Sequence, residues 1–238
     1  MIKILILGSN SFSGSHLSHF LLKKNFKIIG CSLSKKLPLK YNLIDKLEKK
    51  ILKNFKFYKL NINKDLTKLK KIINNQKPEF IIDFMGQGMV AESWEHPYST
   101  FKTNVLSKIK LYNFLLKKKF LKKYIKISTP EIFGSNKKIL NQNNHNPSTP
   151  YALSHSTIEK YLMLLYKQYK FPVVISRFAN FYGPYQKLYR LIPLAIHSAH
   201  LKQKFFLHGG GASRRSFIYC DDFCEGIFKM IKLAKPGD

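Results

Sequence analysis

The fold is decided by the stretch Ile4-Leu5-Ile6-Leu7-Gly8-Ser9-Asn10-Ser11-Phe12-Ser13-Gly14-Ser15-His16-Leu17. Its apolar start predicts a β-strand, its small residues predict a tight turn, and its end predicts a helix. In dinucleotide-binding units the first glycine shapes the turn, the middle residue lets a pyrophosphate approach the backbone, and the last glycine packs helix on strand. Gly8, Ser11 and Gly14 take these places, with Phe12 beside Ser11. The stretch therefore predicts a cofactor-binding loop formed by these four residues.

Beyond this loop, short apolar runs alternate with longer segments of helical spacing. Strands are predicted at residues 2–7, 27–31, 55–60, 80–84, 124–128 and 173–178, and helices at residues 14–24, 66–74, 104–118 and 149–169. This alternation is typical of βαβ units. It predicts an α/β protein with a Rossmann-type, doubly wound parallel sheet, in which ligands bind beyond the carboxyl ends of the strands.

The alternation stops after Pro184, where a basic, glycine-containing stretch at residues 208–217 precedes a last helical segment. We therefore expect a dinucleotide-binding Rossmann domain over residues 1–180. Residues 181–238 would form a small, incomplete substrate-binding lobe.

The net charge of +29 raises the question of a nucleic-acid partner. The lysines, however, are scattered in short runs at expected helix ends and turns, which favours solvated side chains over a nucleic-acid surface. No apolar stretch is long enough to cross a bilayer, so we expect a cytoplasmic protein without membrane insertion. Three cysteines leave one unpaired, and no cysteine or histidine spacing predicts a zinc site, so buried reduced thiols and no metal are expected.

The end of the second predicted strand bears on the choice of cofactor. An acidic residue there usually binds the ribose hydroxyls of NAD, whereas this chain has Cys31-Ser32-Leu33-Ser34-Lys35. Hydroxyls such as that of Ser32, together with a lysine, could instead hold the ribose phosphate of NADP. The two serines could equally form only a turn, so NAD and NADP both remain open.

A candidate catalytic group follows the fifth strand. Ser128, Thr129 and Glu131 lie at the strand end, and Tyr151 lies in the first turn of the next predicted helix. A hydroxyl and a tyrosine in these places can converge on one substrate oxygen. Such a pair suits alcohol oxidation, in which a phenolate takes the hydroxyl proton while hydride leaves for a nicotinamide.

These segments, in this order, resemble the extended short-chain dehydrogenase/reductases of the NAD-dependent epimerase/dehydratase family. The resemblance covers essentially the whole chain and is strongest to dTDP-glucose 4,6-dehydratases. Residues 128–134 are similar to the Ser-Thr-Asp-Glu-Val-Tyr-Gly segment of the dehydratases, and residues 151–155 to their Tyr-x-x-x-Lys motif. By resemblance, the further cofactor-binding residues are Asn61, Ile62, Met85, Gly86, Gln87 and Asn104, and the substrate-binding residues are Asn180 and Arg215.

Two departures from the family pattern fall on the chemistry. His155 stands where the family has the lysine that holds the ribose and lowers the tyrosine pKa, and a histidine is mostly neutral near pH 7. Pro130 stands where the dehydratases have an acidic residue, and proline cannot donate a proton. Elimination of water would need another acid, whereas oxidation followed by epimerisation assisted by Glu131 would not.

The resemblance implies an NAD(P)-dependent nucleotide-sugar dehydratase or epimerase that acts through a transient 4-keto hexose. Its substrate would be a nucleotide-diphosphate sugar, and relatives suggest a homodimer formed through the helices at residues 104–118 and 149–169. The alternative is a Rossmann protein that binds dinucleotide, or RNA, without turnover.

Overall fold

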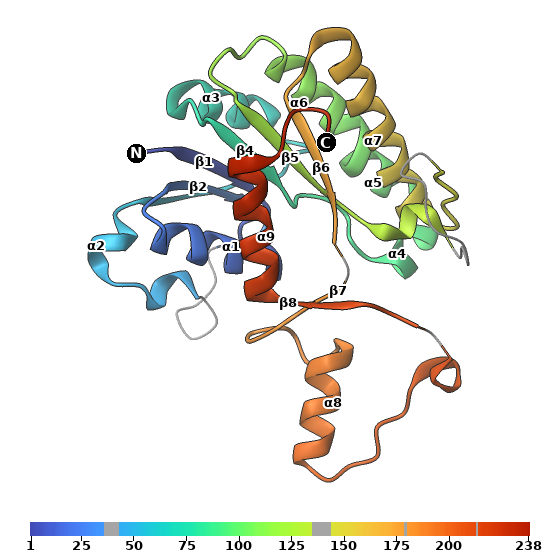
Figure 1. Ribbon diagram of the computed structural model, residues 1–238. Coiled ribbons are helices and arrows are strands. Elements are labelled where there is room, and N and C mark those ends of the chain that lie inside the picture. Colours follow the sequence, from blue (N-terminus) through green and yellow to red (C-terminus); the bar gives the residue numbers. More distant parts are fainter. Residues whose placement is uncertain (36–42, 135–143, 179, 213) are drawn as a thin grey trace.

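The computed structural model describes residues 1–35, 43–134, 144–178, 180–212 and 214–238. Its centre is a six-stranded parallel sheet in the order β3-β2-β1-β4-β5-β6 (Figure 1). The strands are β1 (Lys3–Leu7), β2 (Lys27–Ser32), β3 (Phe55–Lys59), β4 (Phe80–Asp83), β5 (Lys123–Ser128) and β6 (Val173–Arg177). The order reverses between β1 and β4, which confirms the predicted doubly wound sheet. Each predicted strand is confirmed to within one residue at its ends.

Two helical layers cover the sheet. One layer contains α3 (Leu66–Gln76), α6 (Ser107–Leu115) and α7 (Pro150–Tyr169), and the other contains α1 (Phe12–Lys23), α2 (Lys49–Leu52) and α9 (Cys220–Leu233). Side chains of β1 alternate between the layers: Leu5 packs with the first and Ile6 with the second. Because both faces of the strands are buried, the strands appear in the sequence as continuous apolar runs.

The segment between β4 and α6 differs from the prediction of one helix over residues 104–118. Two short helices, α4 (Val90–Glu95) and α5 (Pro97–Phe101), come first, and a π-helical turn over Lys102–Leu106 joins α5 to α6. Helices of five or six residues are too short to show an apolar periodicity. The π-turn carries Asn104, and such turns are frequent at functional sites.

Helix α7 begins and ends where local chemistry predicts. The Thr149 hydroxyl accepts a hydrogen bond from the Ala152 amide at 3.1 Å, and Pro150 occupies the first turn. The helix ends at Tyr169, and the capping residue Lys170 adopts the left-handed conformation with φ 54°. The cap holds Tyr151 in the first turn of α7, at the carboxyl end of β5.

The last part of the chain leaves the main sheet and returns to it. Strands β7 (Asn180–Tyr182) and β8 (Phe217–Tyr219) form a separate parallel pair, and α8 (Leu191–His200) lies away from the main sheet (Figure 1). Helix α9 then packs against α1, and the end of the chain hydrogen bonds along β6, where the Gly237 amide donates to the Val173 carbonyl at 2.8 Å. The domain boundary expected at residue 180 stays a prediction, and α9 contributes to the core of the first unit.

The three cysteines are buried and free, as expected for reduced core thiols. In the part of the chain that the structure describes, none of the helices is both long enough and apolar enough to cross a membrane.

Candidate active site

A groove lies over the carboxyl ends of the central strands, at the point where the strand order reverses. One part of it is lined by the loop after β1, the end of β2 and the loop after β4, and the other by the segments after β3 and β4. Leu33, Met85 and Gly86 line both parts, so the two hollows adjoin. Eight of the predicted cofactor residues line this groove: Gly8, Ser11, Ser32, Asn61, Ile62, Met85, Gly86 and Gln87.

The loop between β1 and α1 has the local geometry of a phosphate-binding turn. Gly8 has φ +86°, a conformation that favours glycine, and a Cβ on Gly14 would lie 2.3 Å from the Gly8 carbonyl oxygen. Ser11 caps α1, since its hydroxyl accepts a hydrogen bond from the Gly14 amide at 3.1 Å. The amino terminus of α1 therefore lies at the groove, and a helix amino terminus attracts phosphate groups. The Phe12 ring packs instead on the His16 ring, with centroids 4.7 Å apart.

Asn10, which the sequence analysis did not select, joins this loop to the end of β2. Its backbone amide donates to the Ser32 hydroxyl at 2.9 Å, and its side-chain amide donates to the Ser34 hydroxyl at 3.2 Å and to the Lys35 carbonyl at 2.8 Å. The serine hydroxyls therefore hold the loop in place as acceptors. Because each hydroxyl keeps its own proton to donate, the contacts are compatible with either NAD or NADP.

The other half of the groove is held by side chains behind it. The Asn61 side-chain oxygen Oδ1 accepts from the Asn63 backbone amide at 2.9 Å, which shapes the segment after β3. The Asn104 side chain accepts from the Gln87 amide at 2.8 Å and donates to the Ser154 hydroxyl at 3.0 Å. Asn104 is 4% exposed, so the structure gives it a positioning contact between the groove and α7.

Three of the predicted catalytic residues, Ser128, Thr129 and Tyr151, meet at the carboxyl end of β5 with His155, the fifth residue of the predicted site besides Glu131. The Tyr151 hydroxyl is hydrogen bonded with the Thr129 hydroxyl. The Ser128 hydroxyl lies 3.4 Å from His155 Nδ1, and the rings of Tyr151 and His155 are in edge contact with centroids 4.7 Å apart. Ser154, which accepts the hydrogen bond from Asn104, lies on α7 between Tyr151 and His155. The contact that ties α7 to the groove is therefore within one helical turn of both residues.

Burial raises the pKa of Tyr151, and the nearby Glu131 carboxylate acts in the same direction. The Thr129 hydrogen bond and the Arg190 charge oppose the rise without cancelling it. The tyrosine is therefore a neutral phenol at pH 7, able to donate a proton in this form.

His155 is 6% exposed, and burial holds its pKa well below the usual value. The positive charge of Lys126 depresses the same pKa further, as does Lys108, while Asp83 acts against them. His155 is therefore neutral across the physiological pH range. It cannot supply the positive charge that the family lysine would place beside the tyrosine.

A buried charge cluster of Asp83, Lys108 and Lys126 lies close to His155. The Lys108 ammonium is 2.5 Å and the Lys126 ammonium 3.7 Å from the Asp83 carboxylate, and the Tyr124 hydroxyl donates to that carboxylate at 2.6 Å. Burial alone would raise the pKa of Asp83, but the two lysines and the hydrogen bonds hold it below its usual value. Burial lowers the pKa of Lys108 to about 8, although Asp83 opposes the shift. The Asp83 carboxylate is thus ionised and Lys108 is mostly protonated at pH 7, so the cluster holds positive charge beside the catalytic group near neutral pH.

We expect acid to destabilise the fold through His155. The unfolded chain binds a proton at this side chain below about pH 6.5, while the folded chain does not. Stability is therefore retained above about pH 6.5 and falls as the pH is lowered, by up to about 1.4 kcal/mol per pH unit. Urea unfolding between pH 5 and pH 8 measures this slope. His155→Gln should reduce it and the exposed-site control His200→Gln should not, so equal slopes for both variants would contradict the assignment.

The remaining site residues lie at the side of the second lobe. The Arg215 guanidinium is 3.1 Å from the Glu131 carboxylate. The residue predicted to bind the substrate therefore forms an ion pair with the residue predicted to act as the base. Asn180 is exposed, and its side-chain amide donates to the Ser216 carbonyl at 3.2 Å, next to Arg215. Both substrate-binding candidates therefore lie where β7 meets the segment that enters β8.

Comparison with known proteins is consistent across sequence and structure. The family model described as GDP-mannose 4,6 dehydratase matches residues 5–238. The dTDP-D-glucose 4,6-dehydratase of Dictyostelium discoideum is 32% identical over 99% of this chain and 57% of its own length. The human dTDP-D-glucose 4,6-dehydratase is 29% identical over 99% of this chain and 67% of its own length. The chain thus spans little more than half of the first relative.

Solved structures share the same fold. The NAD complex of dTDP-glucose 4,6-dehydratase from Bacillus anthracis superposes with a TM-score of 0.83 and 26% identity, covering 100% of this chain and 74% of that chain. The UDP-glucose 4-epimerase of Thermotoga maritima, solved with UDP-glucose, has a TM-score of 0.84 and 24% identity over 97% of this chain and 74% of its own. The second match supports the fold alone.

Proposed function

This chain belongs to the NAD-dependent epimerase/dehydratase family, and we propose that it oxidises and further converts the hexose of a nucleotide-diphosphate sugar with bound NAD or NADP. The proposal rests on the meeting of Ser128, Thr129 and Tyr151 around His155, on a helix that the Asn104 side chain ties to Gln87 in the groove. A second observation supports NAD in particular, since the Bacillus anthracis relative was solved in complex with it.

Tyr151 is the proposed acid and base at the sugar hydroxyl. When bound, the nicotinamide accepts a hydride from the sugar carbon. The Thr129 hydroxyl is hydrogen bonded to Tyr151, so it can donate a hydrogen bond either to the phenolate or to the sugar oxygen. The preceding residue, Ser128, has its hydroxyl 3.4 Å from His155 Nδ1. Because Tyr151 is partly buried, each of these hydrogen bonds is stronger than it would be in solvent.

Positive charge for this step would come from the buried cluster. Lys126 and Lys108 share one carboxylate and together depress the pKa of the neighbouring His155. His155 keeps the place of the family lysine as a neutral hydrogen-bonding ring. It lies against the Tyr151 ring and the Ser128 hydroxyl, and thus positions both.

Glu131 is the proposed base at the carbon next to the transient ketone. Proton removal and return at that carbon, followed by return of the hydride to the ketone carbon, would give an epimer. Proton removal there with loss of the hydroxyl from the next carbon would release water and leave a carbon–carbon double bond. Return of the hydride to that next carbon and of a proton to the first would then give a 4-keto-6-deoxy sugar. The second route needs an acid, and Pro130, which begins the turn with Glu131, offers none. Both products therefore belong in the test, with Tyr151 as the remaining proton donor.

Arg215 and Asn180 are proposed to hold the diphosphate. In the structure Arg215 pairs with Glu131, and the pair is partly exposed to solvent. Such pairs contribute little free energy, so a diphosphate could replace the carboxylate on Arg215. Release of Glu131 would then accompany substrate binding, which would couple the base to the presence of substrate.

The homodimer also stays a prediction. Helix α7 has two exposed leucines, Leu153 and Leu164, on the element through which the resemblance places the interface.

The test is a panel of UDP-, dTDP-, GDP- and CDP-hexoses, each incubated with the purified protein and NAD or NADP. We expect one donor to give a mass loss of one water or an epimer, detected by mass spectrometry and chromatography. Dinucleotide affinity is measured on the same preparation by calorimetry. Dinucleotide binding with no product from any donor would favour the second candidate, a binding protein without turnover, which the neutral His155 and Pro130 support.

A further inference from the structure

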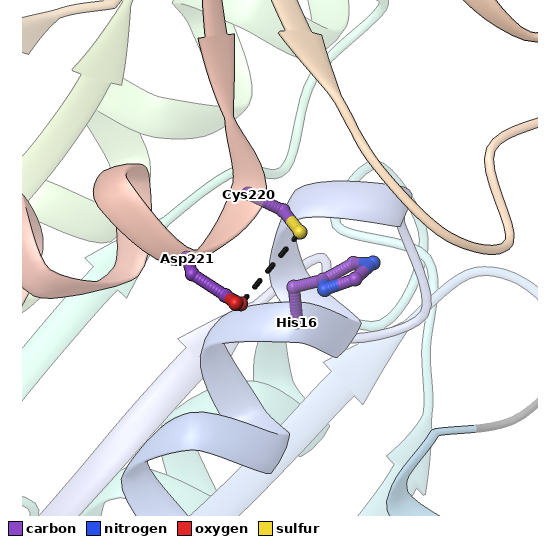
Figure 2. Close-up of side chains that lie close together, drawn as sticks. All are labelled: His16, Cys220 and Asp221. Atoms are coloured by element: carbon purple, nitrogen blue, oxygen red, sulfur yellow. Dashed lines mark hydrogen bonds between the residues drawn. The ribbon is translucent and has the colours of Figure 1, made fainter.

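Three side chains that could bind a metal lie together outside the proposed catalytic group. His16 comes from the middle of α1, and Cys220 and Asp221 begin α9. The potential ligand atoms of the three residues all lie within 4.8 Å of one another. Figure 2 shows the imidazole, the thiol and the carboxylate side by side where the two helices meet. We propose that these residues form a binding site for a zinc-type divalent ion.

The hydrogen bond of His16 is the one expected of a metal ligand. Its Nε2 lies 2.9 Å from the Pro184 carbonyl oxygen. A carbonyl can only accept, so Nε2 carries the proton and Nδ1 keeps its lone pair. Metal-binding histidines commonly donate their other ring N–H to a backbone carbonyl in this way.

The charges of the three groups match a divalent cation. The Cys220 sulfur is 3.7 Å from an Asp221 carboxylate oxygen. Burial is the main cause that raises the pKa of the thiol to about 11, and the charge of the Asp221 carboxylate acts in the same direction. The thiol is therefore protonated at pH 7, and metal binding would release its proton to solvent. One thiolate, one carboxylate and a neutral imidazole would then balance the two positive charges of the ion.

The nature of the ligands selects among metals. Sulfur, imidazole nitrogen and carboxylate oxygen together suit Zn²⁺ or Co²⁺, whereas Mg²⁺ and Ca²⁺ prefer oxygen alone. Three protein ligands leave one position of a tetrahedron for water. Cys220 is 2% exposed and its sulfur would lie 2.5 Å from a Cβ on Gly183, so the thiol is closely packed in its place.

The site would join three segments that the sequence keeps far apart. It connects the helix after the phosphate loop, the segment at Pro184 that leads into the second lobe, and the start of α9. Bound metal would therefore stabilise the contact between cofactor loop and lobe. The expectation of no metal, drawn from residue spacing, missed this group because His16 and Cys220 are at opposite ends of the chain.

The experiment uses the full chain after chelator treatment and dialysis. We expect Co²⁺ to bind with one ion per chain, with a thiolate-to-cobalt charge-transfer band in the near ultraviolet. Zn²⁺ should displace Co²⁺ and abolish the band. Binding should release about one proton per ion near pH 7, measured in weakly buffered solution, because the Cys220 thiol must ionise.

Matched variants locate the ion. Cys220→Ser should abolish the charge-transfer band and weaken binding at least about tenfold, since even an outer-shell change can cost that much. His16→Gln should weaken binding likewise. Cys224→Ser is the control, since Cys224 is also buried and lies one turn along α9, and it should keep both band and affinity. Circular dichroism checks that each variant is folded.

Two results would overturn the proposal. One is wild-type protein that binds no stoichiometric Co²⁺ or Zn²⁺ at micromolar concentration. The other is a folded Cys220→Ser variant that binds as tightly as the wild type with an unchanged spectrum. Neither depends on turnover of a sugar, so the metal site and the proposed function are tested separately.

Discussion

Replacing Tyr151 with phenylalanine is expected to reduce conversion of the nucleotide sugar by about 10²- to 10⁴-fold, the usual contribution of a positioned acid or base. The substitution removes one oxygen from a buried site and leaves the ring contact with His155 in place. The Thr129 hydroxyl loses Tyr151 as a partner at the same time but keeps its hydrogen bond from the Glu131 backbone amide. Single-turnover rates with the converted donor, followed by reduced nicotinamide absorbance, measure the effect on the oxidation step.

The control for this variant lies on the same helix. Tyr169→Phe changes the same kind of side chain at the exposed end of α7, and its rate should stay within about twofold of wild type. Dinucleotide affinity should be unchanged in both variants, because Tyr151 does not line the groove. A Tyr151→Phe enzyme that keeps more than a tenth of the wild-type rate would remove Tyr151 from the role of acid and base.

Replacing Asp83 with asparagine is expected to lower the free energy of unfolding by about 3–5 kcal/mol, the usual cost of removing one partner from a buried ion pair. Asp83 is the anion for two buried lysines, Lys108 and Lys126, and it also accepts from Tyr124. Without it, the two buried lysines would have no counter-charge, and Lys108, whose pKa burial already lowers to about 8, would have to lose its proton or stay charged in a dry environment. Urea denaturation at pH 7, followed by circular dichroism, measures the loss.

Two further variants test the reason for that loss. Asp83→Asn combined with Lys108→Met removes a positive charge along with the negative one, and it should recover part of the stability, since paired removal is much less costly than removal of one partner. Glu48→Gln breaks the exposed pair with Lys50 and should leave the urea midpoint almost unchanged. An Asp83→Asn protein as stable as the Glu48→Gln protein would show that the cluster is not the buried ion group described above.

The sequence by itself determined the sheet and the phosphate loop, because both depend on neighbouring residues. Strands buried on both faces must be apolar at every position, and the loop between Gly8 and Gly14 needs small residues at set places. The short helices α4 and α5 escaped prediction because five or six residues cannot display a period. One local signal for the charge cluster was present: Lys108 occupies a position on the apolar side of its helix, between Val105 and Leu111.

Only the tertiary structure decided which polar groups meet. Asp83, Lys108 and Lys126 come from three different elements, and no local pattern links them. The same is true of Glu131 with Arg215, of Asn10 with Ser32, and of the group at His16. These polar side chains meet their partners only when the sheet brings distant segments together, because desolvation makes an unpaired buried charge or hydroxyl costly. For this protein, the residue types at the strand ends indicated oxidation of an alcohol. Packing of the buried lysines and Asp83 determined the charges around Tyr151 and His155, which the proposed reaction would use.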